Sequence, residues 1–282
     1  MLFRSIWIGH GEDLAAWNLL RDAREFYAQA RQGRAAGQAR APAEQQLAAA
    51  YESLLAAEGS DWCWWYGPEH SSENDAEFDA LYRKHLTEVY VALGVEAPDE
   101  LANPIKRRPV RAVTVPPSAY LPVRVDGRES SYFEWMGAGL YSAIRRSGAL
   151  HGRSYLLHEL RYGFDEKFLY VRVDPLPGAL AELRDCEFRV TVRADEELRV
   201  LARIEQGRLA GYQAESREFC LWGPEGRVNV AFDKILEIAI ARELCVRGPQ
   251  NSLALGVALW QGGLPMDVLP AEGWLEIGRA HV

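Results

Sequence analysis

One short segment, Gly59 to His70, concentrates side chains that could bind a ligand. Its sequence, GSDWCWWYGPEH, holds three of the nine Trp residues of the chain. Flat aromatic faces can stack on the C–H groups of a pyranose ring, while indole N–H and phenol O–H groups bind hydroxyls. The same mixture of aromatic and polar groups is typical of a protein–protein hot spot. The segment therefore predicts a binding surface, and both a sugar and a protein remain open as its partner.

Two carboxylates, Glu58 and Asp61, lie beside these indoles. They are three residues apart, so both could project from one helical face. Glycoside hydrolysis uses two carboxylates, one as the acid and the other as the nucleophile or base. A pair on one helical face rarely flanks a sugar ring from opposite sides. We therefore favour the alternative, in which Asp61 accepts hydrogen bonds from backbone N–H groups and Glu58 is solvated or pairs with Arg.

The other residues with reactive side chains suggest no catalytic centre. His10 has no neighbours at metal-ligand spacing, and His85 lies on the apolar face of a predicted helix, as a satisfied core histidine would. His70 is open to two interpretations, a ligand of a sugar hydroxyl or an ordinary surface residue. No CxxC pair, Gly-rich phosphate loop or GxSxG motif is present. We expect neither a metal nor a cofactor, and we expect buried free thiols at Cys186, Cys220 and Cys245.

Composition narrows the class of protein. The chain has 282 residues, of which 48% are hydrophobic and 26% charged, as in a protein with a packed core. Its net charge of −8 argues against a nucleic-acid partner, which needs clustered Lys and Arg. No apolar run approaches the roughly 20 residues that cross a bilayer, and no signal peptide is recognisable. These features predict a cytoplasmic protein with no membrane partner.

The first third of the sequence predicts helices that position the Trp-rich segment. Apolar residues recur at helical spacing from about residue 13 to residue 93, in three runs. The first stripe contains Leu14, Trp17, Leu20, Ala23, Arg24 and Tyr27. Pro42 stands near the start of the second run, and Gly94 ends the third. We expect a helical bundle over residues 6–93, with the Trp-rich segment as the turn between its second and third helices.

The rest of the chain predicts strands. Six Pro residues between positions 94 and 125 indicate an extended linker on the surface. From about residue 126 the apolar period changes to two, as in YLLHELRYGFDEKFLYVRVD, which we interpret as a hairpin. Many short alternating runs follow, so we expect an antiparallel β-sandwich over residues 126–275. The fold class is therefore α+β and multidomain, with an α-helical bundle followed by the sandwich.

A second concentration of aromatic residues precedes the predicted strands. It is the segment GRESSYFEWMGAGLY, which contains Tyr132, Phe133, Trp135 and Tyr141. We expect these side chains to dock the β-sandwich on the helices.

Both ends of the chain suggest a DNA-level artefact. Leu2 to Ser5 can be encoded by CTC TTC CGA TCT. The reverse complement of that DNA, read with one preceding G, encodes Glu-Ile-Gly-Arg, which is Glu276 to Arg279. We therefore expect residues 1–5 and about 276–282 to derive from a sequencing adaptor, and the chain to be a piece of a longer protein.

Three segments resemble a known enzyme family. They are SIWIGHGEDLAAWNLLRDAREF, AAEGSDWCWWYGPEHSSENDAEFDALYRKHLTEVYVALG and DGRESSYFEWMGAGLY. These segments resemble the C-terminal part of family 57 glycoside hydrolases, in the amylopullulanase-like or α-amylase-like branch. The resemblance covers about residues 6–175. The closing segment, ILEIAIA to NSLALGVALWQGG, is more loosely similar to carbohydrate-binding modules.

The resemblance implies a function and a partner. Members of the family act on α-glucans with retention of configuration, and their catalytic Glu and Asp lie in an N-terminal barrel domain upstream of the segments matched here. It therefore implies no catalytic residue in this chain, which is expected to be inactive alone. Its ligand would be an α-glucan or maltooligosaccharide, and its partner the missing barrel domain. The resemblance implies that the substrate-binding residues are Asp61, Trp62, Trp64, Trp65 and His70. A stand-alone carbohydrate-binding or scaffold protein with no enzymatic parent is the alternative.

Overall fold

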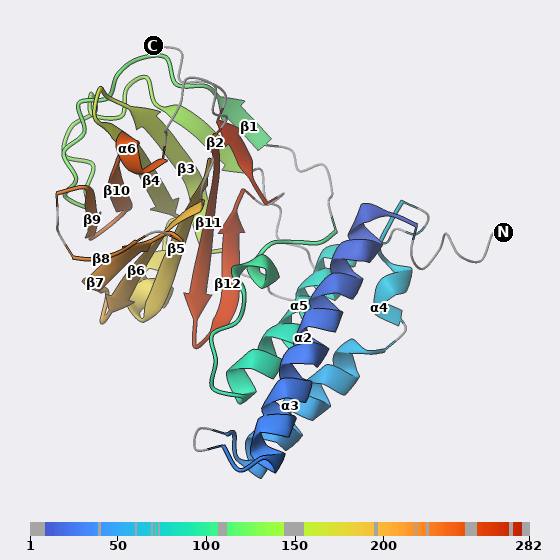
Figure 1. Cartoon of the computed structure of the whole chain (residues 1–282). Coiled ribbons are helices and arrows are strands. Elements are labelled where there is room, and N and C mark those ends of the chain that lie inside the picture. The colour runs from blue at the N-terminus through green and yellow to red at the C-terminus, as the bar shows by residue number, and fades with distance from the viewer. Residues whose placement is uncertain are drawn as a thin grey trace. The chain divides into compact units, whose positions relative to one another are not determined.

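The computed structural model describes residues 9–38, 41–59, 61–68, 70, 72, 74–106, 112–143, 155–194, 197–217, 219–223, 226–245, 253–270 and 273–277. The chain divides into two compact units (Figure 1). The first comprises residues 1–108 and 263–265, and the second comprises residues 109–262 and 266–282. The boundary at residues 108 and 109 lies inside the predicted linker. Among the described residues, no helix has the length and apolar character needed to cross a membrane.

The first unit is helical. Its α-helices are α2 (Gly11–Ala35), α3 (Glu44–Ala57), α4 (Asp61–Trp64) and α5 (Asp75–Ala92), and the 3-10 helix η1 (Asp99–Ala102) follows them. The three long helices confirm the helical runs predicted from the sequence. Their polar first turns explain where two of them begin. The Asp13 carboxylate accepts a hydrogen bond from the His10 backbone N–H at 3.1 Å, and Gln46 accepts one from the Ala43 N–H at 2.8 Å.

The buried face of α2 differs from the predicted stripe. Ala16, Leu20 and Ala23 are buried, whereas Leu14 and Trp17 are 49% and 39% exposed. Alanine on the inner face lets a helix approach its neighbours closely, and the larger side chains then remain outside. The prediction was therefore right for Leu20 and Ala23 and wrong for Leu14 and Trp17.

The second unit contains two antiparallel sheets. The first sheet has the strand order β1-β2-β3-β4-β10-β9, and the second has the order β12-β11-β5-β6-β7-β8, with β13 paired to β11. The strands of the first sheet are β1 (Ala112–Val115), β2 (Gly139–Ala143), β3 (Leu157–Phe164), β4 (Phe168–Pro175), β9 (Val228–Phe232) and β10 (Leu236–Ala241). Those of the second are β5 (Cys186–Arg193), β6 (Glu197–Glu205), β7 (Arg208–Glu215), β8 (Cys220–Trp222), β11 (Leu253–Gln261), β12 (Leu264–Leu269) and β13 (Leu275–Ile277). Two short helices, η2 (Ala179–Arg184) and α6 (Arg242–Cys245), lie between strands in the sequence.

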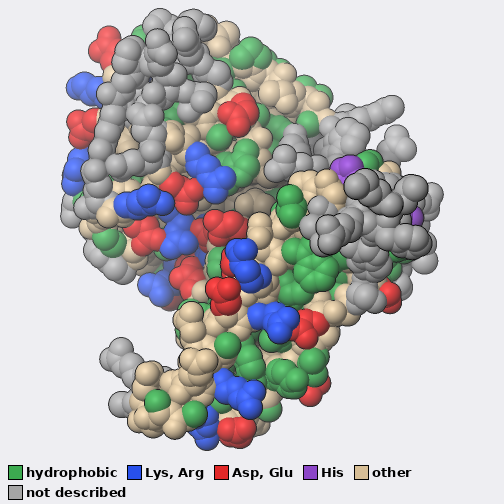
Figure 2. All heavy atoms as spheres, turned by 45° about the vertical axis from the view of Figure 1, so that its right-hand side comes forward, with side chains coloured by type: hydrophobic (Ala, Val, Ile, Leu, Met, Phe, Trp, Pro, Cys, Tyr) green, Lys and Arg blue, Asp and Glu red, His purple; other side chains and the backbone are tan. Residues whose placement is uncertain are grey.

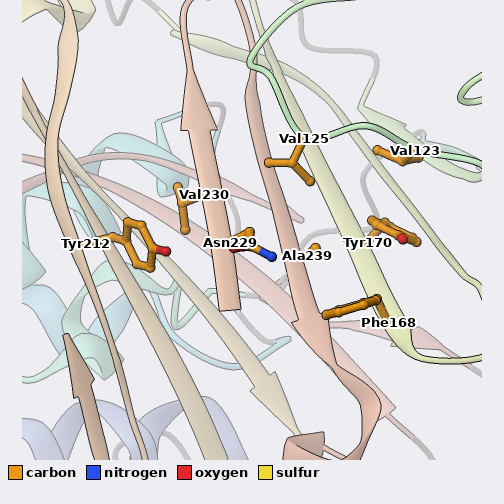
Figure 3. A pocket seen from close by; sticks show the side chains of 8 residues that line it. All are labelled: Val123, Val125, Phe168, Tyr170, Tyr212, Asn229, Val230 and Ala239. Carbon is orange, nitrogen blue, oxygen red and sulfur yellow. The ribbon is translucent and has the colours of Figure 1, made fainter. Parts of the chain in front are cut away.

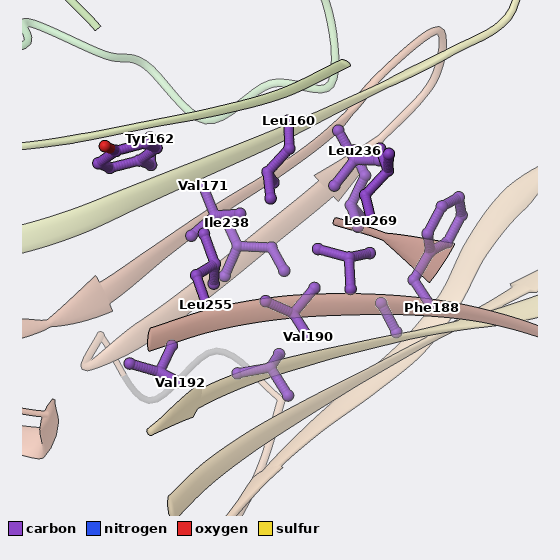
Figure 4. Packing of buried hydrophobic residues seen from close by; sticks show 14 of the residues in the cluster. Leu160, Tyr162, Val171, Phe188, Val190, Val192, Leu236, Ile238, Leu255 and Leu269 are labelled. Atoms are coloured by element: carbon purple, nitrogen blue, oxygen red, sulfur yellow. The ribbon is translucent and has the colours of Figure 1, made fainter. Parts of the chain in front are cut away.

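Both sheets contribute to one hydrophobic cluster (Figure 4). Alternate residues of each strand point into it, as the period of two requires. Val171 and Ile238 enter from the first sheet, and Val190, Val192 and Leu255 enter from the second. The alternating runs predicted from the sequence therefore form two antiparallel sheets with a shared core, and the fold combines helices with antiparallel sheets.

The segment expected to be a surface linker contributes to both units. Its first part forms η1, where Leu101 is buried, and its second part contains β1, which pairs with β2. Leu121 is buried, and its backbone N–H donates to the Phe164 carbonyl at 2.9 Å. The six Pro residues of this segment therefore do not prevent Leu101 and Leu121 from packing, each within its own unit.

The aromatic segment expected to dock the sheets on the helices packs differently. Tyr141 belongs to the core between the sheets, and Trp135 is buried against the first sheet, where its Nε1 donates to Glu237 at 3.0 Å. Tyr132 and Phe133 are 75% and 67% exposed. The docking prediction is wrong for Trp135 and Tyr141, because the second unit itself buries them.

Most of the residues predicted to derive from a sequencing adaptor lie outside the part of the chain that the structure describes. Residues 1–5 and 278–282 are outside the described residues. Glu276 and Ile277 form part of β13 and pair with Ala254 and Leu253. Strand pairing does not bear on the origin of the codons, so the adaptor origin stays a prediction.

Candidate functional site

The Trp-rich segment forms a turn, and the buried side chain of Tyr66 anchors this turn in the interior of the helical unit. Tyr66 is buried, and its hydroxyl donates to Asp79 Oδ1 at 3.2 Å. Burial raises the pKa of Tyr66 well above that of a free phenol, so the hydroxyl stays a hydrogen-bond donor. The preceding helical turn, α4, places Cys63 on the same buried side. Two buried residues thus hold a segment whose other side chains lie nearer the surface.

The acceptor below Tyr66 is the centre of a buried polar network. Asp79 also accepts hydrogen bonds from Arg83 Nε at 2.8 Å, from the Ile105 N–H at 2.9 Å and from the Lys106 N–H at 3.1 Å. Arg83 in turn donates from Nη1 to the carbonyls of Leu101 and Ala102. Both members of the ion pair therefore also bond to other groups of the helical unit, which offsets the cost of burying their charges. It ties α5 both to the Trp-rich turn and to the chain that follows η1.

A second set of contacts fixes the end of the turn. The Lys106 ammonium donates to the carbonyls of Gly67 and His70, and its Nζ lies 3.7 Å from Glu12 Oε2. Glu12 accepts the Gly67 backbone N–H at 2.9 Å. Gly67 is therefore held by Glu12 of α2, and Lys106 binds the carbonyls of both Gly67 and His70.

Two of the three indoles pack within the helical unit. Trp62 donates from Nε1 to the Ala56 carbonyl at 2.7 Å, which satisfies its polar group. Its ring lies edge-on to Phe78, with ring centroids 6.2 Å apart, and near His85. Trp65 stacks on the same Phe78 at 5.4 Å with an interplanar angle of 13°. Both side chains are only partly accessible, so they serve mainly as the packed base of the turn.

The third indole presents an open surface. Trp64 is 38% exposed, and its ring rests against the imidazole of His70 with centroids 4.0 Å apart and an interplanar angle of 32°. Asp61 is exposed at the start of the same short helix and accepts no hydrogen bond from a described residue. Figure 2 shows other hydrophobic side chains gathered over the helices, among Lys, Arg, Asp and Glu.

The structure therefore divides the five predicted site residues. Trp64 and His70 are in contact, and Asp61 stands three residues before Trp64 on α4. Trp62 and Trp65 pack against Phe78 instead, Trp62 edge-on and Trp65 stacked. The alternative favoured for the two carboxylates is confirmed for Glu58, whose Oε1 lies 3.2 Å from Arg24 Nε. It is wrong for Asp61, which binds no backbone N–H among the described residues.

Several residues that form the site were not singled out from the sequence. These are Glu12, Asp79, Arg83 and Lys106. One signal was present, because Asp79 and Arg83 stand four apart on the same helical face as Tyr82 and Leu86. Charged residues on an apolar stripe indicate a buried pair. Among the residues that the structure describes, no group of three or more His, Cys, Asp or Glu side chains could hold a metal ion.

Comparison with known proteins adds no relative. No family model, no curated protein and no solved structure matches the chain.

Proposed function

We propose that the chain binds α-glucan through Trp64 and His70, as a non-catalytic C-terminal portion of a retaining glycoside hydrolase similar to family 57. The observation that carries this proposal is the half-exposed indole of Trp64 resting on His70, next to two indoles that are packed away. Trp62 and Trp65 are partly buried against Phe78, whereas the exposed face of Trp64 contributes nothing to the core.

The geometry suits a sugar because the ring is held in place before a ligand arrives. The contact with His70 limits the rotation of the indole, and Lys106 fixes the backbone carbonyl of His70. A preordered aromatic face costs little conformational entropy on binding. The Asp61 carboxylate can accept hydrogen bonds from the hydroxyls of a sugar that lies on this face. Trp62 and Trp65 support the platform in this proposal and do not touch the glucan.

The remaining parts of the proposal rest on resemblance. The helical bundle would form one wall of a glucan site, and an N-terminal barrel domain would supply the other wall with the catalytic Glu and Asp. The two antiparallel sheets would form a β-sandwich similar to a carbohydrate-binding module. The chain alone would not hydrolyse glucan, so release of reducing sugar from amylose or pullulan by the pure chain would contradict this part.

The experiment is a titration of the full chain with maltohexaose, followed by tryptophan fluorescence. The change in fluorescence should saturate in the wild type and be absent in Trp64→Ala. Asp61→Asn tests the carboxylate, because it keeps the shape of the side chain and weakens its acceptor strength. Loss of self-association in Trp64→Ala, with no effect of sugar on the wild type, would instead favour a protein-binding surface.

A further inference from the structure

The second unit has a hollow of about 470 Å³ that extends from the outer side of its first sheet around the edge strand β9, where Val230 and Tyr212 border it (Figure 3). Leu169, Val171 and Ile238 point into the core, so the residues that alternate with them on β4 and β10 face outward. The volume is within the range of about 300–1,000 Å³ that is usual for small-molecule sites. The lining residues are Val123, Val125, Phe168, Tyr170, Tyr212, Asn229, Val230 and Ala239.

The floor of the hollow follows from strand register. Asn229 of β9 pairs with Ala239 of β10, and Ala239 pairs with Tyr170 of β4. The three residues therefore form one row across three strands. Strands are spaced about 4.8 Å apart, so Asn229 and Tyr170 are separated by about 10 Å, with only the methyl group of Ala239 between them. A small residue between two larger ones produces the depression.

The walls of the hollow are fixed by hydrogen bonds. The Tyr212 hydroxyl donates to the Val228 carbonyl at 2.9 Å, which holds this ring of β7 against the edge strand β9. The Tyr170 hydroxyl donates to Asp165 Oδ2 at 2.8 Å. Figure 3 shows Asn229 between Tyr212 on one side and Phe168 and Tyr170 on the other.

The segment that carries Val123 and Val125 closes the last side. It is held at one end by the bond from the Leu121 N–H to the Phe164 carbonyl. At the other end, Glu237 accepts the N–H groups of Asp126 and Gly127 at 3.0 and 2.9 Å. The hollow is thus already formed without a ligand, which lowers the entropic cost of binding one.

The chemistry of the lining selects a class of ligand. None of the eight lining side chains is charged. The two tyrosine hydroxyls already donate to the protein, which leaves their oxygens as acceptors. The Asn229 amide makes no hydrogen bond with a described side chain or backbone group, so it offers both donors and an acceptor. A phosphate would find no cation here, and an alkyl chain would leave the amide unsatisfied.

We infer that this hollow binds one neutral pyranose ring of an oligosaccharide, with its C–H groups against the aromatic side chains and its hydroxyls on Asn229. This site is separate from Trp64, and its existence does not depend on glucan binding by the helical unit.

The test is a nuclear magnetic resonance titration of the ¹⁵N-labelled full chain with maltotriose and, separately, with cellotriose. We expect at least one sugar to shift the Asn229 side-chain amide and the Ala239 backbone amide saturably. The same shifts should occur in Trp64→Ala. Asn229→Ala should weaken binding at Ala239 about tenfold, since one or two hydrogen bonds are lost. Ala239→Leu should abolish it by filling the floor. Gln213→Ala, which removes an amide from β7 outside the hollow, should leave it unchanged.

Each outcome is decisive. Shifts at Ala239 that persist in Trp64→Ala support the hollow even if the helical unit binds no glucan. The absence of saturable shifts at Asn229 and Ala239 with both sugars overturns the inference, whether or not Trp64 responds. A third titration uses adenosine. If adenosine shifts the Asn229 and Ala239 signals saturably and neither sugar does, the inference is also overturned, because the hollow would then bind a planar base. Retained melting temperatures show that the variants are folded.

Discussion

Arg83 Nε lies 2.8 Å from Asp79 Oδ2, and the side chains of both residues are almost completely buried. The pair is linked to the Trp-rich turn, because Asp79 also accepts a hydrogen bond from the Tyr66 hydroxyl. The position of the exposed Trp64 therefore depends on an ion pair that no ligand would touch.

Removing one partner of this pair should be costly. We expect Arg83→Met to lower the free energy of unfolding by about 3–5 kcal/mol, because Asp79 would remain as a buried charge without its partner. Urea unfolding followed by the helical circular dichroism signal measures this change. The matched control is Arg24→Met, which breaks the solvent-exposed pair with Glu58 and should cost less than about 1 kcal/mol. Equal effects of the two substitutions would contradict burial of the pair.

A close approach at Gly163 should make this position intolerant of a side chain. A Cβ added to Gly163 would lie 2.4 Å from Leu121 Cδ1, so the buried Leu121 would have to move. We expect Gly163→Ala to destabilise the second unit by about 1–3 kcal/mol, as overpacking does. Gly211→Ala on β7 is the control, because a Cβ there meets nothing within 4 Å. Thermal unfolding of both variants checks this, and a Gly163→Ala protein as stable as the control would show that the segment is not packed there.

Glu237 should make the second unit less stable as the pH rises. Burial raises the pKa of this carboxyl above its ordinary value of 4.5, although hydrogen bonds from Asp126, Gly127 and Trp135 partly offset the shift. Between the two pKa values the folded state binds more protons than the unfolded state, so the free energy of unfolding falls as the pH rises. This contribution is complete below pH 4.5 and is lost above the raised pKa.

The comparison that isolates this group is Glu237→Gln, which cannot titrate. The stability of the wild type relative to this variant should decrease as the pH rises from 4.5, with unfolding followed in urea at each pH. A difference that stays constant or grows across that interval would rule out a raised pKa for Glu237.

Thiol reactivity should distinguish one cysteine from the other three. Burial raises the pKa of Cys63 to about 11 and those of Cys186 and Cys245 to about 12. Cys220 is exposed. The thiolate is the reactive form, so iodoacetamide at pH 8 should modify Cys220 first in the folded chain. Peptide mass spectrometry measures the order, and early modification of Cys63 would mean that the base of the Trp-rich turn opens readily.

The elements of the fold could be predicted because burial repeats with the period of each element. Alternating residues such as Val171 and Val173 identified the strands, and the helical runs were found in the same way. The rotation of α2 could not be predicted, since it turns Ala16 inward and leaves Trp17 exposed. Hydrophobicity ranks Trp above Ala, but close helix packing favours the smaller side chain.

The composition of the Trp-rich segment predicted where the candidate site lies in the sequence, but not which of its side chains are exposed. The concentration of indoles marked the turn that carries the candidate site. Which indole faces solvent depends on partners far along the chain, such as Phe78 for Trp65. The contribution of Lys106 was hidden because a short basic run before a proline has the composition of a solvated linker. Such contacts follow from the tertiary fold, and no local pattern encodes them.

The most direct test of glucan binding is the dissociation constant of maltohexaose for the full chain, measured by calorimetry for three proteins. These are the wild type, Trp64→Ala and Phe133→Ala, the last of which removes a still more exposed aromatic side chain from the other unit. We predict binding at the Trp64 platform that is weakened at least tenfold in Trp64→Ala and unchanged in Phe133→Ala. Equal affinity of all three proteins, or no binding by the wild type, would contradict the proposal that Trp64 and His70 form a glucan platform.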